Sequence, residues 1–171
     1  MIHLNIGSNL ESLYGSRFNN ITITINLLIE AKIEIKKISN FYETPSYPNR
    51  NFPKFLNVGL IAKYKKNYSD LLKKIKLIEK KLGRIKTKKN DPRIIDIDII
   101  DFNNEIEKAK EITLPHPKCH LRNFVLFPIL QIDPNWSHPI FNKNAQFFIN
   151  KLSQKFRIEI TRIKKNVNIE S

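Results

Sequence analysis

The sequence predicts an α+β fold of the ferredoxin-like type, in which helices pack on a mixed or antiparallel sheet to give three α-β-α layers with mobile loops. The order of the segments supports this prediction: strand-like and helix-like stretches follow one another as β-α-β, β-α-β, which is typical of a split βαβ arrangement. The length of 171 residues matches one domain, and a chain of this size buries about 70% of its unfolded surface. We therefore expect a single domain over residues 1–171.

The first half of the chain contains three predicted strands and one helix. A short buried strand over residues 2–7 ends at turn residues and leads to a helix over about 17–32. Alternating apolar residues predict strands over 33–43 and 55–64. Between these strands, three prolines stand among polar residues, which excludes a helix or a central strand and predicts a mobile binding loop over 45–53.

The second half of the chain begins with the most regular helical pattern. Ser69 is the predicted N-cap, apolar residues follow at helical spacing, and Gly83 is expected to end the helix. A basic loop over 84–92 then leads to a strand over 93–102.

The remaining elements are expected to complete the sheet and its cover. A hairpin is predicted around Asn103-Asn104, and apolar segments predict helices over about 121–132 and 145–152. Residues 156–163 are expected to form a terminal strand. The pattern gives no role to residues 143–171.

The strand over 93–102 carries the most informative pattern in the chain. Asp96 and Asp98 alternate with isoleucines, so both carboxylates are expected on one face of the sheet, about 6.6 Å apart along the strand. Two like charges this close repel unless a cation lies between them, and Mg²⁺ accepts one or two carboxylates together with water and phosphate oxygens. The pattern therefore predicts a magnesium site for a nucleotide. A half-buried strand with a solvated acidic face is the alternative.

Five cationic or potentially cationic side chains flank loops near this strand in the sequence. They are Arg84, Lys86, Arg93, His116 and Arg122. Arginine matches phosphate oxygens through its fork geometry, and phosphoryl-type transfer depends mainly on positioning and charge stabilisation. These groups are therefore candidates for neutralising a triphosphate together with bound Mg²⁺. Surface arginines without a ligand are the alternative.

Two aromatic residues and an amide form a candidate slot for a heterocycle. Phe55 and Phe124 can stack on a flat ring, and Asn57 can read its edge, although phenylalanines of this kind also occur simply as core residues. The chain has only four glycines and no Gly-rich phosphate loop, so phosphate binding has to rely on metal and side chains.

Three residues that lie close in sequence could suggest a zinc site. His116, Cys119 and His120 offer suitable ligands, but a structural zinc site takes four ligands in paired spacings, and His3 and His138 stand alone in the sequence. We therefore do not expect zinc.

Composition points to a cytoplasmic protein without a membrane segment. The single cysteine excludes an internal disulfide and fits a reducing compartment, and no stretch approaches the length of a membrane span. The net charge of +14 suggests a basic ferredoxin-like RNA-binding domain as an alternative function. The chain lacks the aromatic-rich sheet motif of such domains, so no nucleic-acid partner is expected. A monomer is expected.

Seven short segments share their order and spacing with one known family. They are Ile6-Gly7-Ser8-Asn9-Leu10, Phe41-Tyr42-Glu43-Thr44-Pro45, Phe55-Leu56-Asn57, Leu82-Gly83-Arg84, Asp91-Pro92-Arg93-Ile94-Ile95-Asp96-Ile97-Asp98, Leu114-Pro115-His116-Pro117 and Arg122-Asn123-Phe124-Val125-Leu126. Over about residues 2–136 the chain thus resembles the 6-hydroxymethyl-7,8-dihydropterin pyrophosphokinases of folate biosynthesis.

The resemblance implies that ATP donates its pyrophosphoryl group to the hydroxymethyl oxygen of the pterin and leaves as AMP. Two Mg²⁺ ions are implied at Asp96 and Asp98. The implied catalytic residues are Arg84, Arg93, Asp98, His116 and Arg122. The implied nucleotide contacts are Glu79, Lys86, Ile99, Thr113 and His116. The implied pterin contacts are Thr44, Phe55, Asn57 and Phe124.

The chain departs from the common family pattern at four points. Asn90 stands where many members have a tryptophan, Phe55 replaces a frequent tyrosine, and Lys86 replaces an arginine. The loop over 84–92 is also one residue shorter than in some members. These differences concern closure of the catalytic loops and affinities, and they leave the implied reaction unchanged.

Overall fold

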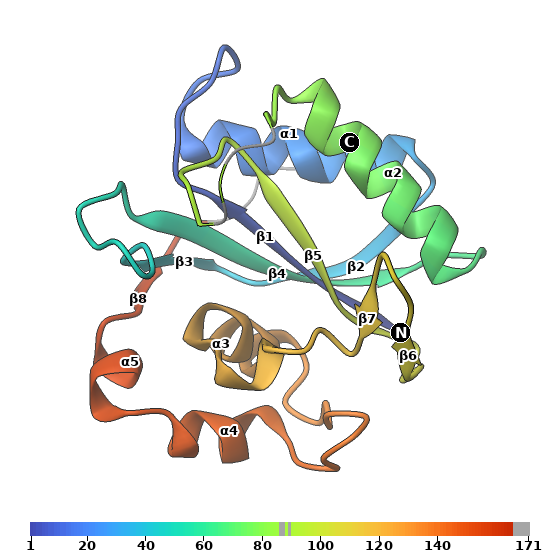
Figure 1. Ribbon diagram of the computed structural model, residues 1–171, viewed down its shortest axis with the longest axis vertical. Coiled ribbons are helices and arrows are strands. Elements are labelled where there is room, and N and C mark those ends of the chain that lie inside the picture. Colours follow the sequence, from blue (N-terminus) through green and yellow to red (C-terminus); the bar gives the residue numbers. More distant parts are fainter. Residues whose placement is uncertain (86–87, 89, 166–171) are drawn as a thin grey trace.

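The structure is a computed structural model that describes residues 1–85, 88 and 90–165 (Figure 1). Its centre is a six-stranded sheet in the order β5-β1-β4-β3-β8, and β2 pairs with β4 beyond the end of β3. All of these pairings are antiparallel. The strands are β1 (Ile2–Ser8), β2 (Glu34–Ile38), β3 (Phe41–Thr44), β4 (Phe55–Lys63), β5 (Asp96–Phe102) and β8 (Thr161–Ile163).

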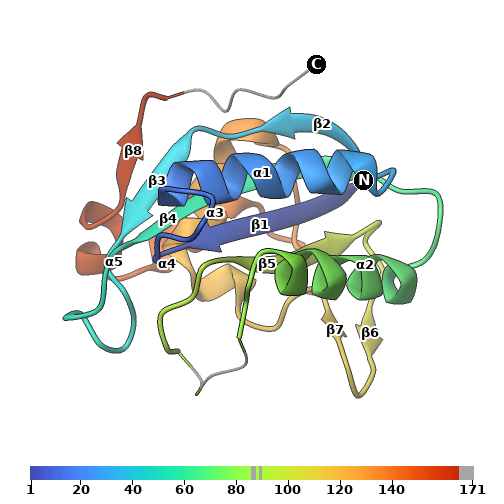
Figure 2. The ribbon, with the colours of Figure 1, turned by 90° about the horizontal axis from the view of Figure 1, so that it is seen from above.

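Helices cover both faces of this sheet, which gives the three predicted layers (Figures 1 and 2). On one face lie α1 (Arg17–Glu30) and α2 (Tyr68–Lys81), and on the other lie α3 (Asn123–Ile132) and α4 (Ala145–Lys151). The short α5 (Gln154–Ile158) connects α4 to β8. The predicted α+β fold is therefore confirmed, and its sheet is antiparallel. Among the described residues, no helix has the length and apolar character that crossing a bilayer requires.

The strand β4 is buried on both faces because helices cover the centre of the sheet from both sides. Its pattern is a continuous buried run from Leu56 to Ala62, although the sequence predicts alternation. Gly59 lies at the point where β4 meets α3, and a Cβ atom placed there would lie 2.7 Å from Cβ of Pro128. Only a residue without a side chain lets α3 approach the sheet this closely.

Gly59→Ala is therefore expected to reduce the free energy of unfolding by about 1–3 kcal/mol, because the added methyl group overpacks the contact with Pro128. Urea denaturation of the parent and the variant measures the change. An unchanged midpoint and slope would show that α3 can move away from the sheet without loss of packing.

The helix α2 begins earlier than the sequence predicts. Its N-cap is Asn67, whose side chain accepts a hydrogen bond from the Asp70 backbone N–H at 3.0 Å, so the prediction of Ser69 was wrong. Both residue types are good caps, and the local pattern does not choose between them. Gly83 follows the helix with φ of +86°, as expected for a residue that ends a helix.

The predicted strand over 33–43 is divided into two. It separates into β2 and β3 around Ser39, whose hydroxyl accepts a hydrogen bond from the Gly59 backbone N–H at 2.9 Å. The Ser39 backbone N–H in turn donates to the Gly59 carbonyl at 2.9 Å. The chain thus stays attached to β4 where it bends, and both strands pair with β4.

Three further predictions need correction. Asn103 and Asn104 form a turn with φ of +54° and +61°, but the chain does not return along β5. Instead, β6 (Glu107–Lys108) and β7 (Thr113–Leu114) pair with each other. The predicted strand over 156–163 is helical at its start, and only β8 is extended. A 3-10 turn over Cys119–Leu121 replaces the first turn of the helix predicted from residue 121.

Candidate active site

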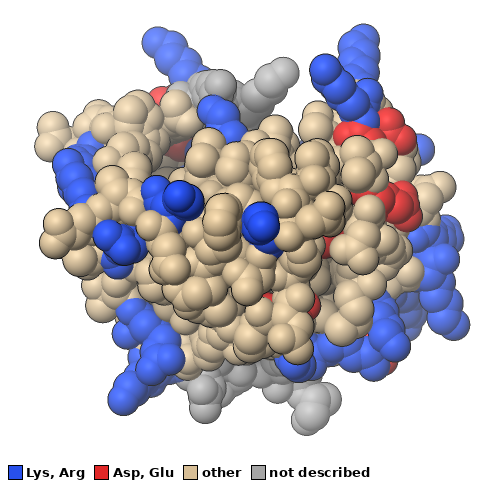
Figure 3. Space-filling model, turned by 90° about the horizontal axis from the view of Figure 1, so that it is seen from below, with Lys and Arg blue, Asp and Glu red and all other residues tan. Residues whose placement is uncertain are grey.

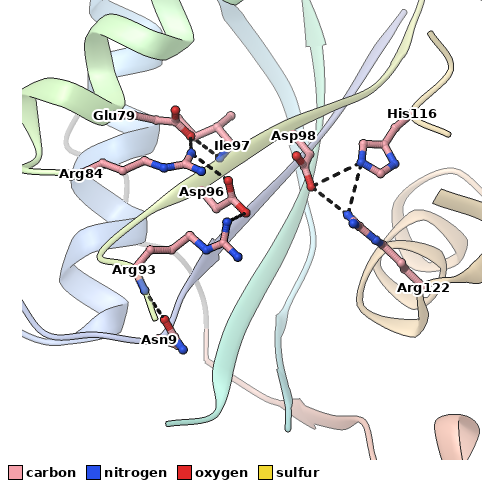
Figure 4. A network of polar contacts seen from close by, with 9 residues as sticks. All are labelled: Asn9, Glu79, Arg84, Arg93, Asp96, Ile97, Asp98, His116 and Arg122. Atoms are coloured by element: carbon pink, nitrogen blue, oxygen red, sulfur yellow. Dashed lines mark hydrogen bonds and ion pairs between the residues drawn. The ribbon is translucent and has the colours of Figure 1, made fainter. Parts of the chain in front are cut away.

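The strand β5 presents two carboxylates to a group of basic side chains (Figure 4). The side chains of Asp96 and Asp98 are 26% and 27% exposed, whereas Ile95, Ile97 and Ile99 between and beside them are at most 6% exposed. The alternation predicted from the sequence is therefore confirmed. The isoleucines fix the strand in the core, and this holds both carboxylates on the same face.

Asp96 is surrounded by positively charged groups. Arg84 Nη1 lies 2.8 Å from its Oδ1, and Arg93 Nη1 lies 3.1 Å from its Oδ2. Arg84 also pairs with Glu79, whose Oε1 accepts a hydrogen bond from the Ile97 backbone N–H at 2.9 Å. Glu79 therefore orients Arg84 and is tied to β5 itself.

Asp98 faces a second pair of groups. Arg122 Nη1 lies 3.1 Å from its Oδ2, and His116 Nε2 lies 4.0 Å from the same oxygen. Arg122 Nη1 is also 3.3 Å from His116 Nε2. Arg122, the residue just before α3, and His116, from the loop after β7, thus converge on a single carboxylate (Figure 4).

Burial raises the pKa of both aspartates, and for Asp96 the neighbouring charge of Asp98 adds to this increase. Nearby arginines oppose the shift. Two hard oxygen donors on one face, partly open to solvent, fit the coordination chemistry of Mg²⁺. The residues present therefore suit the predicted metal.

Neutral histidine is the relevant form of His116. Burial, together with the charge of Arg122, lowers the pKa of His116 to about 4. Its Nδ1 accepts a hydrogen bond from the Lys118 backbone N–H at 3.2 Å, so the proton of the neutral ring is assigned to Nε2. Arg122 Nη1 is itself a donor, so with this tautomer its approach to Nε2 is a contact without a hydrogen bond. The Nε2–H lies on the side of Asp98 and Arg122, where it can donate to an anion.

Burial also favours the neutral form of Glu79, which for a carboxylic acid means a higher pKa. Burial raises the pKa of Glu79 to about 7, although Arg84 and the Ile97 N–H act in the other direction. The family resemblance implied a nucleotide contact for Glu79, but Glu79 is not among the residues that line the cavity formed by Ile99, Thr113 and His116. Its contacts give it the position of a support for Arg84 and β5.

A cleft of about 490 Å³ opens beside the two aspartates. The predicted residues that line it are Thr44, Phe55, Asn57, Arg93, Asp96, Asp98, Arg122 and Phe124. Asn90, at the position that departs from the family pattern, also lines it. The structure thus brings the predicted pterin contacts and part of the predicted phosphate contacts into one cavity.

The inner end of this cleft is built around a glycine. Asn57 is 2% exposed, and its Nδ2 donates to Thr44 Oγ1 at 3.4 Å. A Cβ atom at Gly7 would lie 3.0 Å from Asn57 Oδ1 and 3.5 Å from Phe55 Cδ1. The absence of a side chain at Gly7 of β1 therefore makes room for two predicted pterin contacts, Asn57 and Phe55.

Arginines lie over the aromatic rings of the cleft. The guanidinium of Arg93 is 5.7 Å from the ring centre of Phe55, and that of Arg122 is 5.4 Å from the ring centre of Phe124. The same two arginines contact the aspartates. The aromatic slot and the charged region are consequently adjacent.

A second cavity of about 300 Å³ lies on the other side of Asp98. Three predicted nucleotide contacts, Ile99, Thr113 and His116, line it, and Asp98 lines both cavities. Lys86 lies outside the described residues. The two cavities therefore meet at the carboxylate that Arg122 contacts.

Sequence reasoning missed two asparagines at this end of the sheet. Asn5 lies on β1 opposite Asp98, is 4% exposed and lines the cleft, and its Oδ1 is buried without a hydrogen-bond partner among the described residues. The sequence signal that could have identified Asn5 is an amide side chain within an otherwise apolar strand. The other residue, Asn9, belongs to a turn and to the first of the segments shared with the family, but neither signal gave it a role in the site.

Asn9 joins three loops through one buried side chain. Its Oδ1 accepts from the Arg93 backbone N–H at 2.7 Å, and its Nδ2 donates to the Pro53 carbonyl at 3.1 Å and to Ser46 Oγ at 3.3 Å. The Asn9 backbone N–H also donates to the Arg93 carbonyl at 3.2 Å. The loop over 45–53 and the arm that carries Arg93 are therefore held by the same residue.

The structure groups two of the residues considered for zinc, Cys119 and His120, with His138. The possible ligand atoms of Cys119, His120 and His138 lie within 4.8 Å of one another, and His116 is not part of this group. His138 Nδ1 already accepts from the backbone N–H groups of Ile140 at 3.2 Å and Phe141 at 3.5 Å. Burial raises the pKa of the Cys119 thiol to about 12.

His138 is expected to make the protein sensitive to acid. Burial lowers its pKa from 6.5 to about 4, so the unfolded state binds more protons between these values. Stability from this group is complete above pH 6.5 and falls by up to about 3 kcal/mol as the pH decreases to 4. His138→Asn keeps an acceptor for the two amides and should flatten this slope. Urea denaturation at pH 7 and pH 4.5 tests it, and parallel losses in parent and variant would contradict it.

Comparison with known proteins agrees with the resemblance seen in the sequence. The family model described as 7,8-dihydro-6-hydroxymethylpterin-pyrophosphokinase (HPPK) matches residues 3–134. A 2-amino-4-hydroxy-6-hydroxymethyldihydropteridine pyrophosphokinase from Aquifex aeolicus is 40% identical over 147 residues, which cover 86% of this chain and 89% of that protein. The protein of the same name from Bacillus subtilis is 32% identical over 131 residues, 76% of each chain.

A solved structure supports the fold. The Plasmodium falciparum protein described as HPPK-DHPS matches with a TM-score of 0.70 at 15% identity, over 94% of this chain. The match spans 47% of that longer chain, about half of its length. From the family model and the relatives of similar length, we conclude that the chain belongs to the 7,8-dihydro-6-hydroxymethylpterin-pyrophosphokinase family.

Proposed function

We propose how this chain carries out the reaction of its family, the transfer of the pyrophosphoryl group of ATP to the hydroxymethyl oxygen of 6-hydroxymethyl-7,8-dihydropterin. The products are the pterin diphosphate, a folate precursor, and AMP. The observation that carries the proposal is the position of Asp98, which lines both cavities beside Asp96. The aromatic cleft suits the pterin, and the second cavity suits the nucleotide.

Asp96 and Asp98 would hold Mg²⁺, and two ions are proposed. Bound Mg²⁺ supplies charge neutralisation for the polyphosphate. The arginines that now contact these carboxylates are placed to bind phosphate oxygens, Arg84 and Arg93 on one side and Arg122 on the other. His116 would donate its Nε2–H to a phosphate oxygen, and its low pKa keeps it neutral at physiological pH.

The pterin would bind between Phe55 and Phe124, with its edge on Asn57 and Thr44. In this position its hydroxymethyl group would lie toward Asp98, and its oxygen would attack the β-phosphorus in line with the bond to the leaving AMP. Asp98 is also the proposed acceptor of the hydroxyl proton. A bound cation lowers the pKa of a carboxylate, so this contribution is smaller than that of positioning.

We further propose that the chain works in the cytoplasm as a monomer with two small-molecule substrates. The RNA-binding alternative is not favoured, because the family is one of enzymes. On the face seen from below, Lys and Arg side chains lie mainly toward the edges, some of them beside Asp and Glu, and are few near the centre (Figure 3).

Release of AMP tests the proposal directly. The protein is incubated with ATP and Mg²⁺, with and without 6-hydroxymethyl-7,8-dihydropterin. AMP is expected only when the pterin and Mg²⁺ are both present, and EDTA should stop its formation. ATP turnover that ignores the pterin, or binding to RNA that falls steeply with salt in the absence of AMP release, would overturn the proposal.

A further inference from the structure

The C-terminal segment over 153–163 lies along the open edge of the cleft. It contains α5 and β8, and both views place α5 at the same end of the molecule as the loop over 45–53 (Figures 1 and 2). Phe156 and Glu159 line the cleft, although they lie outside residues 3–134 that the family model matches. The site therefore includes a part of the chain to which the family comparison gives no role.

The backbone of this segment is fixed at two points. Asn123, which is 4% exposed at the start of α3, donates from its Nδ2 to the Phe156 carbonyl at 2.7 Å. Farther along, Arg162 pairs with Tyr42 in the β3–β8 register. Both anchors belong to the sheet and its cover, so the side chains between them have defined positions.

The segment contacts the loop over 45–53 through two pairs of side chains. The rings of Tyr47 and Phe156 lie with their centres 5.0 Å apart. Arg50 Nη2 donates to Glu159 Oε2 at 2.5 Å, and the Glu159 side chain is only 11% exposed. The Arg50 guanidinium also lies 5.3 Å from the ring centre of Tyr47.

The position of this contact within the cleft indicates what it recognises. The loop starts directly after Thr44, one of the proposed pterin contacts, and Tyr47 lines the cleft with Phe156. Arg84, Arg93 and Arg122 define the polyphosphate side. Among the described residues, none of these arginines forms a side-chain hydrogen bond or an ion pair with the segment over 153–163. An apolar, aromatic wall next to Thr44 suits a flat heterocycle and not a phosphate chain.

We propose that the segment over 153–163 completes the pterin site: Phe156 forms its outer wall, and the Arg50–Glu159 ion pair holds the loop over 45–53 against that wall. Phe156 is thus a substrate-binding residue, and Arg50 and Glu159 are positioning residues. The inference rests on the proposed function, and it assigns the C-terminal segment to pterin affinity.

Steady-state kinetics with each substrate varied in turn tests the proposal. Phe156→Ala should raise the KM for the pterin about tenfold, since the wall and its contact with Tyr47 are lost, and Phe156→Tyr should restore most of the affinity. Glu159→Gln and Arg50→Gln should each raise this KM by about two- to fivefold. Because they remove the same ion pair, the double variant should be no worse than either single one. The KM for ATP should not change.

Arg157→Gln is the matched control, because it removes one positive charge from an exposed position of α5. It should leave both KM values unchanged. Hydrogen–deuterium exchange of peptides covering 45–55, measured without substrates, gives a second readout: exchange should be faster in Glu159→Gln and Phe156→Ala than in the parent and in Arg157→Gln.

Two results would overturn the proposal. One is an unchanged pterin KM in Phe156→Ala. The other is an equal rise of both KM values together with a lower melting temperature, which would indicate a general loss of folding. A parent protein that released no pterin-dependent AMP would instead contradict the proposed function, and the exchange measurement would still report whether the segment holds the loop.

Discussion

Replacing Asp96 or Asp98 with asparagine is expected to lower kcat/KM for AMP formation by at least about 10³-fold, because an amide cannot replace a charged ligand of Mg²⁺. The fold should survive. Burial raises the pKa of both side chains, so the ionised forms are disfavoured in the folded protein without metal, and a neutral amide removes this cost. The melting temperature without Mg²⁺ should therefore stay equal or rise slightly.

Two measurements separate this prediction from general damage. Mg²⁺ with a non-hydrolysable ATP analogue should raise the melting temperature of the parent but not of the two variants. Glu105→Gln, an exposed carboxylate in the turn after β5, serves as the charge-matched control and should behave as the parent. AMP formation at the parent rate in Asp96→Asn or Asp98→Asn would show that the metal site is elsewhere.

Arg122→Ala is expected to reduce kcat by about 10²–10³-fold, as is typical when one preorganised charged donor is removed from the transition state. Arg122 is placed for this role because its Nη1 lies 3.1 Å from Asp98 and its guanidinium covers the ring of Phe124. Arg122→Lys should recover part of the rate, since it keeps the charge but not the planar fork. Steady-state kinetics measures both variants.

A control and a contrary outcome accompany this prediction. Arg157→Ala removes an exposed arginine of α5 and should leave kcat unchanged. If Arg122→Ala kept kcat within threefold of the parent, Arg122 would be only a partner of Asp98 and would make no contact with the transferred group.

Local periodicity explains why part of the site was predictable. The alternation of β5 placed Asp96 and Asp98 on one face without knowledge of the rest of the chain. Covering of the sheet on both faces, in contrast, is a property of the whole fold, and it removed the alternation expected in β4. The cap at Asn67 was missed because Ser69, two residues later, is an equally good candidate by residue type.

Contacts between distant residues explain what the sequence did not reveal. Asn9 and Arg93 are 84 residues apart, and Arg50 and Glu159 are 109 residues apart. No pattern within a window of ordinary length links such pairs. The same holds for Asn5, whose position next to Asp98 results from the register of β1 against β5.

The hydrogen bonds of Asn9 limit how the enzyme could be altered to accept a different heterocycle. One amide shares its hydrogen bonds between the proline-containing loop and the main chain at Arg93, so neither can be displaced while the other stays in place. A redesign that widens the aromatic slot by moving this loop would also withdraw a guanidinium from Asp96. A variant that accepts a bulkier ring is therefore expected to transfer the pyrophosphoryl group at a different rate as well.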